Sequence, residues 1–400
     1  MKYIVIVPDG MADYPIPALK GKTPLEYAQT PNMDFLAQHG LVGMIQTIPD
    51  NLPPGSDVGN LSAMGYDPRK SFSGRAPLEA ANMNVALGKN DIAFRCNLVT
   101  IGDKKMADYS AGHISSKEAA ALIAALNKNN KMRNVKFYPG KSYRHLTIIK
   151  SSHTKKLSQC QCTPPHDILN KKINSFFPKG ANAKILNDLM EWSKGILKDH
   201  PVNKKRIAEG KSPATMIWLW GQGLKPQLPL FKKKFGITGS VISAVDLVNG
   251  IGKLIGLNVI RVPGATGYYD TNYKGKAQYA LRSLKKNDFI FIHIEAPDEA
   301  GHNGDLRMKV KCIELIDKEV IGTILKRYKA GGDFRILILP DHRTPLSKRT
   351  HTREPVCFVM SGKNIQIQGS RSFSEKTAAN SGIFFATGEK LMNYFIKGNG

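Results

Sequence analysis

The sequence YIVIVPDG (residues 3–10) contains an unbroken apolar, β-branched run that stops at a proline, an aspartate and a glycine. Such a run without polar alternation is typical of a strand that is buried on both faces of a parallel sheet and continues into a loop. Residues 216–220, 289–294 and 336–339 repeat this pattern, and three of the four runs are followed closely by an aspartate. Because ligands of open α/β sheets bind beyond the carboxyl ends of the strands, we expect the chemistry at that edge.

Helical segments alternate with these runs. Residues 243–254, 275–284 and 306–327 have helical character, and in the last of them apolar residues recur every three or four positions. This alternation predicts an α/β fold, with a mainly parallel sheet flanked by helices on both faces.

The middle of the chain has a different character. Residues 75–210 contain much lysine, a turn at Pro164 and Pro165, and strand-like runs at 95–101 and 145–149. We therefore predict a discontinuous core domain, residues 1–74 and 211–400, and a smaller inserted α+β domain, residues 75–210, that binds substrate as a lid.

Composition indicates a folded chain of 400 residues, of which 42% are hydrophobic and 22% charged, and excludes disordered and fibrous proteins. No window has the 18 apolar residues of a membrane-spanning helix, and the first apolar run stops too early for a signal peptide. Among the five cysteines only Cys160 and Cys162 are close, and one residue separates them, so they form no CxxC motif. We expect a protein of the reducing cytoplasm.

The chain is strongly basic, with 58 lysines and arginines against 32 acidic residues and a net charge of +26. A charge of this size fits solvated lysine-rich faces, a field that steers an anionic substrate, or nucleic-acid or membrane binding. The basic residues occur in small groups along the whole chain instead of in one block. This distribution favours solvated faces, and no membrane or nucleic-acid partner is expected.

Loops at the predicted strand ends carry carboxylate and imidazole side chains. Each such residue alone would be an ordinary turn former, helix cap or polar residue. Together they can converge on hard or borderline divalent ions, and two ions are the natural number. No cysteine accompanies them, although a closed structural zinc site would favour cysteine. The residues are Asp9, Asp298, His302, Asp341, His342 and His351.

A serine, Ser56, lies in the segment PPGSDVGN (residues 53–60), between a glycine-containing turn and the predicted start of a helix. Unpaired N–H groups and the dipole at a helix N-terminus would stabilise a phosphate on this serine. Taken alone, Ser56 would be a helix N-cap. Beside two cations its hydroxyl would lose its proton more readily and act as a nucleophile without a Ser-His-Asp triad.

Six short motifs, in this order, resemble the archaeal-type cofactor-independent (2,3-bisphosphoglycerate-independent) phosphoglycerate mutases of the alkaline phosphatase superfamily. The resemblance extends over residues 1–394 and implies an alkaline-phosphatase-like core. The metal pattern also occurs in phosphatases, phosphopentomutases and sulfatases, whereas the set of motifs is specific. The motifs are PDGMAD (8–13), TPNMD (30–34), PGSDV (54–58), GYDP (65–68), DEAGH (298–302) and PDH (340–342).

The resemblance implies a metal-dependent interconversion of 3-phosphoglycerate and 2-phosphoglycerate through a phosphoserine intermediate, a step of glycolysis and gluconeogenesis. It implies Mn²⁺, with Zn²⁺, Co²⁺ or Mg²⁺ as alternatives, and neither bisphosphoglycerate nor a nucleotide as cofactor. It divides the ligands into Asp298, His302 and His351 for one ion, and Asp9, Asp341, His342 and the nucleophile Ser56 for the other.

The expected substrate, a small phosphorylated acid, carries a phosphate and a carboxylate, both of which suit bidentate guanidinium groups. In the inserted domain the candidate contacts are Arg95, His113, Arg144 and His145, and they lie in segments that resemble the family. Alone, each of them would more often be a surface charge, and the resemblance brings the two interpretations to about equal weight. The sequence does not indicate an oligomeric state.

Two alternatives remain at this point. A related phosphotransferase, such as a homoserine-kinase-like enzyme, or a phosphohydrolase would use the same metal-binding core. A nucleic-acid-binding protein would use the net charge and would lose affinity steeply with salt. That alternative leaves the aspartate and histidine cluster without a purpose.

Overall fold

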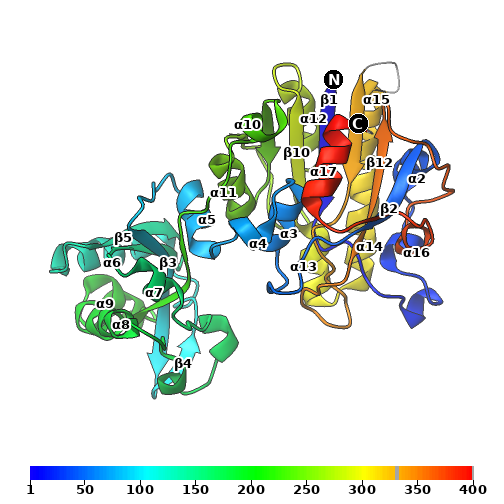
Figure 1. Cartoon of the computed structure of the whole chain (residues 1–400). Coiled ribbons are helices and arrows are strands. Elements are labelled where there is room, and N and C mark those ends of the chain that lie inside the picture. Colours follow the sequence, from blue (N-terminus) through cyan, green and yellow to red (C-terminus); the bar gives the residue numbers. More distant parts are fainter. Residues whose placement is uncertain (329–332, 399–400) are drawn as a thin grey trace. The chain divides into compact units, whose positions relative to one another are not determined.

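The computed structural model describes residues 1–328 and 333–398, which form two compact units (Figure 1). The first unit comprises Met1–Phe72 and Gln227–Gly400, and the second comprises Ser73–Pro226. The second unit therefore begins at residue 73 instead of 75 and ends at residue 226 instead of 210.

An eight-stranded, mainly parallel sheet forms the centre of the first unit, in the order β13-β2-β12-β11-β1-β10-β8-β9. Strands β11, β1, β10, β8 and β9 run parallel, whereas β12 is antiparallel to both of its neighbours. The strands are β1 (Lys2–Pro8), β2 (Gly40–Ile45), β8 (Gly239–Ile242), β9 (Asn258–Ile260), β10 (Phe289–Ile294), β11 (Phe334–Ile338), β12 (Val356–Gly362) and β13 (Phe384–Phe385).

The register of the three central strands aligns their carboxyl ends. Val7 of β1 pairs with His293 of β10, and Ile6 pairs with Ile338 of β11. These strands are mainly apolar because both faces of the sheet are covered, and Ile6 and Val7 are fully buried on opposite faces. The strands predicted from the three runs that precede an aspartate are confirmed. The loops after β10, β1 and β11 therefore start from one edge.

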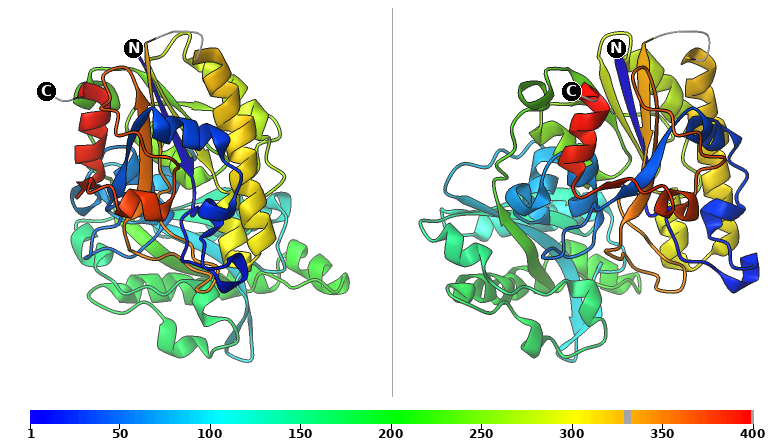
Figure 2. Two further views of the ribbon diagram at one scale, coloured as in Figure 1. Left: turned by 90° about the vertical axis from the view of Figure 1, so that its right-hand side faces the viewer. Right: turned by 45° about the vertical axis from the view of Figure 1, so that its right-hand side comes forward.

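Helices cover both faces of this sheet (Figure 2). Helices α2, α12, α14 and α15 pack on one face, and α3, α11 and α17 on the other. No helix in the described part of the chain is long and apolar enough to cross a membrane. The helices of this unit are α1 (Pro24–Tyr27), α2 (Pro31–Gln38), α3 (Ser56–Ala63), α4 (Pro68–Ser71), α10 (Phe231–Phe235), α11 (Asp246–Leu254), α12 (Tyr273–Ser283), α13 (Ala296–Asn303), α14 (Leu306–Leu315), α15 (Gly322–Tyr328), α16 (Glu375–Ala379) and α17 (Gly388–Lys397).

The second unit contains a five-stranded antiparallel sheet, in which β4, β3, β6 and β5 follow one another and β7 pairs with β3. Helices α6 and α8 share one apolar core with this sheet. The elements are β3 (Asp91–Gly102), β4 (Lys105–Asp108), β5 (Val135–Lys141), β6 (Arg144–Lys150), β7 (Met216–Leu224), α5 (Arg75–Asn82), α6 (Ser116–Asn129), α7 (Thr154–Ser158), α8 (Ala183–Lys198) and α9 (Pro201–Ala208).

Strand β7 corrects one prediction. We expected residues 216–220 in the main parallel sheet, but β7 is antiparallel to β3 in the second unit. Its run is apolar because α5, α7 and α8 pack against it. An apolar run shows that both faces of a strand are covered, but it does not show which strands are its neighbours. Residues 211–226 therefore belong to the second unit.

A buried ion pair joins α14 to two loops at the carboxyl edge of the main sheet. Lys309 of α14 is fully buried, and its Nζ donates to Asp13 Oδ2 and to the carbonyl oxygen of Thr344, both at 2.7 Å. Asp13 Oδ2 also accepts the backbone N–H of Leu346 at 3.1 Å. The pair thereby holds the loops that follow β1 and β11 against one helix.

We expect Lys309→Met to lower the free energy of unfolding by about 3–5 kcal/mol, because it leaves the Asp13 carboxylate buried without its partner. Denaturant unfolding of the metal-free protein measures the change. Lys311→Met, at an exposed position of the same helix, is the matched control. An equal effect of the two substitutions would contradict a structural role for the buried pair.

Candidate metal centre

Each of the three central strands leads into a segment that carries predicted ligands. Helix α13 begins two residues after β10, and the other two segments follow β1 and β11. On α13 the two predicted ligands lie four positions apart in the sequence, about one helical turn, and therefore face the same side. The residues are Asp9 after β1, Asp298 and His302 on α13, and Asp341 and His342 after β11.

The first ligand group consists of Asp298, His302 and His351. His302 Nε2 lies 3.1 Å from Asp298 Oδ2 and 3.0 Å from His351 Nε2, and His351 Nε2 lies 3.5 Å from Asp298 Oδ1. Ligands bound at about 2.1 Å to one ion are separated by roughly 3.0–3.4 Å, which is close to these distances. The carbonyl oxygen of Arg349 lies 3.0 Å from His302 Nδ1 and accepts its proton, so Nε2 is the nitrogen that would bind an ion once its own proton is displaced.

The second ligand group consists of Asp9, Asp341, His342 and Ser56. His342 Nε2 lies 3.4 Å from Asp9 Oδ1, 3.4 Å from Asp341 Oδ2 and 3.1 Å from Ser56 Oγ. The Asn60 side-chain amide donates to Asp341 Oδ2 at 2.7 Å and fixes that carboxylate. The structure therefore brings all seven predicted ligands into two adjoining groups.

His342 lies between the two groups. Its ring is 4.1 Å from the His351 ring, centroid to centroid, and ligand atoms of Asp298, His342 and His351 also lie within 4.8 Å of one another. The Thr344 hydroxyl contacts both sides, since it donates to Asp298 Oδ1 and lies 3.2 Å from His342 Nδ1. Thr344 therefore links the orientations of one ligand from each group.

The burial of these carboxylates tests whether the site fits cations. Asp9 and Asp341 are fully buried, and Asp298 is nearly so. Burial raises the pKa of Asp9 well above its ordinary value, and the neighbouring charges of Asp341 and Glu295 raise it further. Asp9 Oδ1 is buried without a hydrogen-bond partner. Divalent ions would supply the missing positive charge and the missing partner, and a donor set of oxygen and imidazole nitrogen suits them.

Sequence reasoning missed His293, which lies in β10 and is fully buried. Its Nε2 lies 2.8 Å from Asp9 Oδ2, and ligand atoms of Asp9, His293 and Asp341 lie within 4.8 Å of one another. The signal that could have revealed it is that His293 is the single polar residue of the otherwise apolar strand β10. Glu295, just after the strand, was missed as well, and burial raises its pKa to about 8.

Ser56 is the first residue of α3, and Gly55 is the N-cap. The Ser56 hydroxyl makes no capping hydrogen bond and faces His342 instead, so the structure does not support the alternative of a simple N-cap. Gly59 allows α3 to approach the ligand loop, because a Cβ at this position would lie 2.5 Å from the carbonyl oxygen of Asp341. The start of α3 is thus held against the second ligand group.

The predicted substrate residues lie in the second unit, on different faces of its sheet. Arg95 pairs with Leu146 and Asn97 with Arg144, so Arg95 and Arg144 share one face. His145 follows Arg144 and points to the opposite face, where it is 2% exposed and its Nδ1 accepts the backbone N–H of Gly140. Burial lowers the pKa of His145 to about 3, as is typical of a neutral interior histidine.

Arg95 and Arg144 are accompanied by aromatic rings. The Arg95 guanidinium lies 4.0 Å from the centre of the Trp220 ring and donates to Glu79 at 3.1 Å. The Arg144 guanidinium is 5.7 Å from the Tyr143 ring, and the same ring lies 6.2 Å from the His113 ring. Arg95, Arg144 and His113 thus lie in a polar and aromatic environment.

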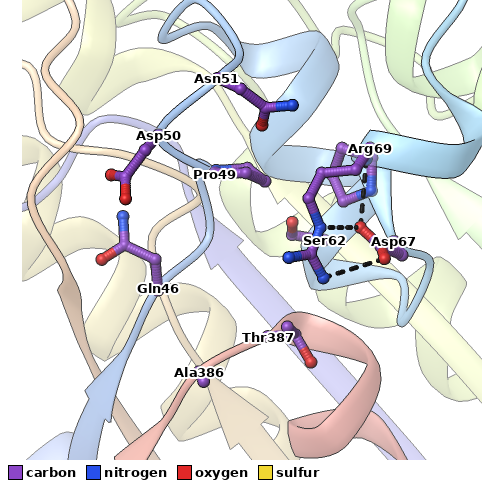
Figure 3. Close-up of a pocket in the computed structure, with 10 residues that line it drawn as sticks. Gln46, Pro49, Asp50, Asn51, Ser62, Asp67, Arg69, Ala386 and Thr387 are labelled. Carbon is purple, nitrogen blue, oxygen red and sulfur yellow. Dashed lines mark hydrogen bonds and ion pairs between the residues drawn. The ribbon is translucent and has the colours of Figure 1, made fainter.

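A separate pocket of about 360 Å³ lies in the first unit (Figure 3). It contains the Asp67–Arg69 ion pair, and Gln46, Pro49, Asp50 and Asn51 of the segment that precedes Ser56 form one wall. None of the predicted site residues lines it. The metal centre and this pocket are therefore distinct features.

Comparisons with known proteins show the family of this chain. The chain is 50% identical over 399 residues to a Methanosarcina barkeri protein named 2,3-bisphosphoglycerate-independent phosphoglycerate mutase, and the match covers 99% of this chain and all of the relative. The chain belongs to that family. The family's sequence model, with the same description, matches residues 37–203. A Geobacter sulfurreducens relative named a probable enzyme of this kind is 48% identical over 403 residues, which is 99% of this chain and all of the relative.

Solved structures of similar proteins have the same fold. The cofactor-independent phosphoglycerate mutase of Thermoplasma acidophilum is 25% identical, covers both chains completely and has a TM-score of 0.69. A Pyrococcus horikoshii structure is 30% identical, with 99% of this chain and 96% of that chain covered and a TM-score of 0.84. The α/β fold with a mainly parallel sheet and the family resemblance are confirmed.

His302 provides a measurable consequence of the ligand geometry. The hydrogen bond with Asp298 raises the pKa of His302 from 6.5 to about 9, although burial opposes the shift. Burial raises the pKa of Asp298, but its hydrogen bonds with His302 and His351 outweigh this and hold it well below the ordinary value. In the metal-free protein the raised pKa of His302 stabilises the fold fully below pH 6.5, as long as Asp298 stays ionised, and this contribution is lost as the pH rises through about 9.

We expect the His302 ring resonance of the metal-free protein to titrate near pH 9 in NMR spectra, with His302→Gln to assign it. A metal ion must displace this proton, so Mn²⁺ binding at pH 7.5 should release protons. Calorimetry in buffers of different ionisation enthalpy measures the release. His302→Gln should release fewer protons, and an unchanged release would contradict a role for His302 as a ligand.

Proposed function

We propose that this chain interconverts 3-phosphoglycerate and 2-phosphoglycerate through a phosphoserine at Ser56 and without 2,3-bisphosphoglycerate. The position of Ser56 carries the proposal: its Oγ lies 3.1 Å from His342 Nε2 at the first residue of α3, beside Asp9 and Asp341. A nucleophilic hydroxyl, ligands for cations and the N-terminus of a helix coincide there. The printed names of the full-length relatives support this reaction.

In the first half-reaction Ser56 Oγ forms a bond to phosphorus, and the bond between phosphorus and one glycerate oxygen breaks. The proton of the Ser56 hydroxyl is transferred to that oxygen. The other glycerate hydroxyl then forms a bond to phosphorus, the bond between phosphorus and Ser56 Oγ breaks, and the proton of that hydroxyl is transferred to Ser56 Oγ. Backbone N–H groups at the start of α3 stabilise the phosphoryl oxygens. Water must be excluded between the two steps, because hydrolysis of the phosphoserine would make the enzyme a phosphatase.

Two divalent ions, when bound, would lower the pKa of the Ser56 hydroxyl and offset the negative charge on the phosphoryl group. We propose Mn²⁺ for this role, with Zn²⁺, Co²⁺ or Mg²⁺ as alternatives. One ion would be held by Asp298, His302 and His351, and the other by Asp9, Asp341, His342 and Ser56. Asn60 and Thr344 keep the ligand side chains in place.

We assign substrate binding and water exclusion to the second unit. Arg95, Arg144 and His113 supply donors for a phosphate or a carboxylate. His145 is left out of this set because its side chain is interior. The described cysteines are free thiols, in keeping with a reducing cytoplasm, where glycolysis and gluconeogenesis take place.

Ser56→Ala tests the nucleophile. We expect turnover to fall by at least about three orders of magnitude, because a covalent nucleophile is lost, while the fold is kept. A coupled assay from 3-phosphoglycerate to 2-phosphoglycerate, with Mn²⁺ and without bisphosphoglycerate, measures the rate. Ser62→Ala is the matched control, since Ser62 lies on the same helix and its hydroxyl binds the Thr47 carbonyl oxygen.

Mass spectrometry of wild-type protein quenched with 3-phosphoglycerate should reveal a phosphorylated peptide that contains Ser56. A homoserine-kinase-like enzyme would require ATP and form no such peptide, and a phosphohydrolase would release inorganic phosphate.

Chelation should abolish turnover, and added Mn²⁺ should restore it. A fully active Ser56→Ala protein that never acquires phosphate would refute the proposal.

Arg144→Met tests the second unit. Loss of one charge-assisted hydrogen bond should lower kcat/KM by roughly 10–100-fold, because such bonds contribute about 1.5–3 kcal/mol. Arg144 is exposed, so thermal stability should not change. Arg133→Met, an exposed arginine of the same unit, is the matched control. If the two variants had equal kcat/KM, Arg144 would not contact the substrate.

A further inference from the structure

Three side chains form a continuous hydrogen-bonded row across neighbouring strands of the first unit. Ser243 follows β8, His293 lies in β10 and Asp9 follows β1, and these three strands are adjacent and parallel. Ser243 Oγ lies 3.1 Å from His293 Nδ1, and His293 Nε2 lies 2.8 Å from Asp9 Oδ2. The proposed reaction does not otherwise use Ser243 or His293.

The partners of this row determine where its protons lie. An ionised carboxylate only accepts hydrogen bonds, so with Asp9 ionised, as a metal ligand must be, His293 donates its Nε2–H to Asp9 Oδ2. Nδ1 of the neutral ring is then the acceptor, and the Ser243 hydroxyl donates to it. Ser243 Oγ itself accepts the backbone N–H of Val245 at 2.9 Å. The Asp9 carboxylate thereby fixes the tautomer of His293, and the Ser243 hydroxyl completes the hydrogen bonding of that tautomer and holds the ring.

This arrangement occupies one oxygen of Asp9 and leaves the other free. Oδ2 accepts from His293, whereas Oδ1 is buried without a hydrogen-bond partner and lies 3.4 Å from His342 Nε2. The oxygen that faces the second ligand group is therefore Oδ1. Rotation of the carboxylate would break the bond with His293 and leave a buried N–H unpaired.

Burial and a second anchor hold the His293 ring in place. The ring is fully buried, and the fully buried Lys276 of α12 donates from Nζ to the His293 carbonyl oxygen at 2.9 Å. The backbone at the end of β10 is therefore held from one side, while Ser243 holds the ring from the other. Neither interaction depends on the second unit.

We propose that His293, held by Ser243, is a positioning residue that orients Asp9 so that Oδ1 binds the metal ion of the second ligand group. The inference rests on the proposed function, because it takes Asp9 as a ligand. His293 also lies near enough to Asp9 and Asp341 to be a ligand itself, so the test must separate the two roles.

The experiment titrates metal-free protein with Mn²⁺ and follows free Mn²⁺ by electron paramagnetic resonance, which gives the number of bound ions and their affinities. His293→Leu removes both nitrogens, and His293→Gln retains a side-chain N–H donor. Ser243→Ala removes the hydroxyl that holds the ring. Ser240→Ala is the matched control, because Ser240 is a buried serine of β8 whose hydroxyl accepts from Ser283.

We expect His293→Leu to weaken one of the two Mn²⁺ sites by about 10–100-fold and to leave the other unchanged, as is usual when a partner of a metal ligand is lost. His293→Gln should recover most of the lost affinity, Ser243→Ala should lose less than His293→Leu, and Ser240→Ala should match the wild type. In the assay, kcat at limiting Mn²⁺ should fall with little change in KM. Circular dichroism of each metal-free variant checks its fold.

Wild-type affinity of both sites in a folded His293→Leu protein would overturn the inference. A loss of the ion in His293→Gln as large as in His293→Leu would also overturn it, by making His293 itself a ligand. If His293→Leu does not fold, Ser243→Ala becomes the deciding variant. Wild-type Mn²⁺ affinities in Ser243→Ala would then contradict the inference. If the wild-type protein bound fewer than two ions, this result would contradict the proposed function itself and not only the role of His293.

Discussion

Mutual repulsion of buried carboxylates is the constraint on which the rest of this site depends. The ends of β1, β10 and β11 deliver Asp9, Asp298 and Asp341 to one edge of the sheet, where all three have little contact with solvent. Burial raises the pKa of Asp9 well above its ordinary value, and repulsion by the neighbouring charges of Asp341, Glu295 and Asp298 raises it further. The surroundings therefore have to supply positive charge and hydrogen-bond donors at this edge.

The neighbouring residues meet this requirement in two ways. Imidazoles and donors such as the Asn60 amide contact some of the carboxylate oxygens. Asp9 Oδ1 has no hydrogen-bond partner and is left to bind a cation. Small residues allow the loops to come close. Gly10 has a φ of +60°, and a Cβ there would lie 2.5 Å from Asp298 Oδ1. Only glycine adopts this backbone conformation without strain, and only glycine fits between Asp9 and Asp298.

The same edge of the sheet explains why Ser56 is suited to the role proposed for it. At the start of a helix a serine is usually a cap, but here Gly55 is the cap and the Ser56 hydroxyl faces His342. The close contact of Gly59 with the Asp341 loop brings the helix N-terminus and the second ligand group together. A helix N-terminus that favours anions thus lies beside a group that favours cations, as phosphoryl transfer requires.

The sequence by itself determined the strands around the site and most of the candidate ligands, because these signals are local. Apolar runs that end in aspartate predicted β1, β10 and β11, and the spacing of Asp298 and His302 placed both on one helix face. Only the tertiary structure decided where β7 belongs and what His293 contacts. A strand's partners depend on long-range packing, and an apolar run looks the same in a parallel or an antiparallel sheet. The burial of His145 likewise follows from strand alternation and the helices on that face, neither of which one histidine reveals.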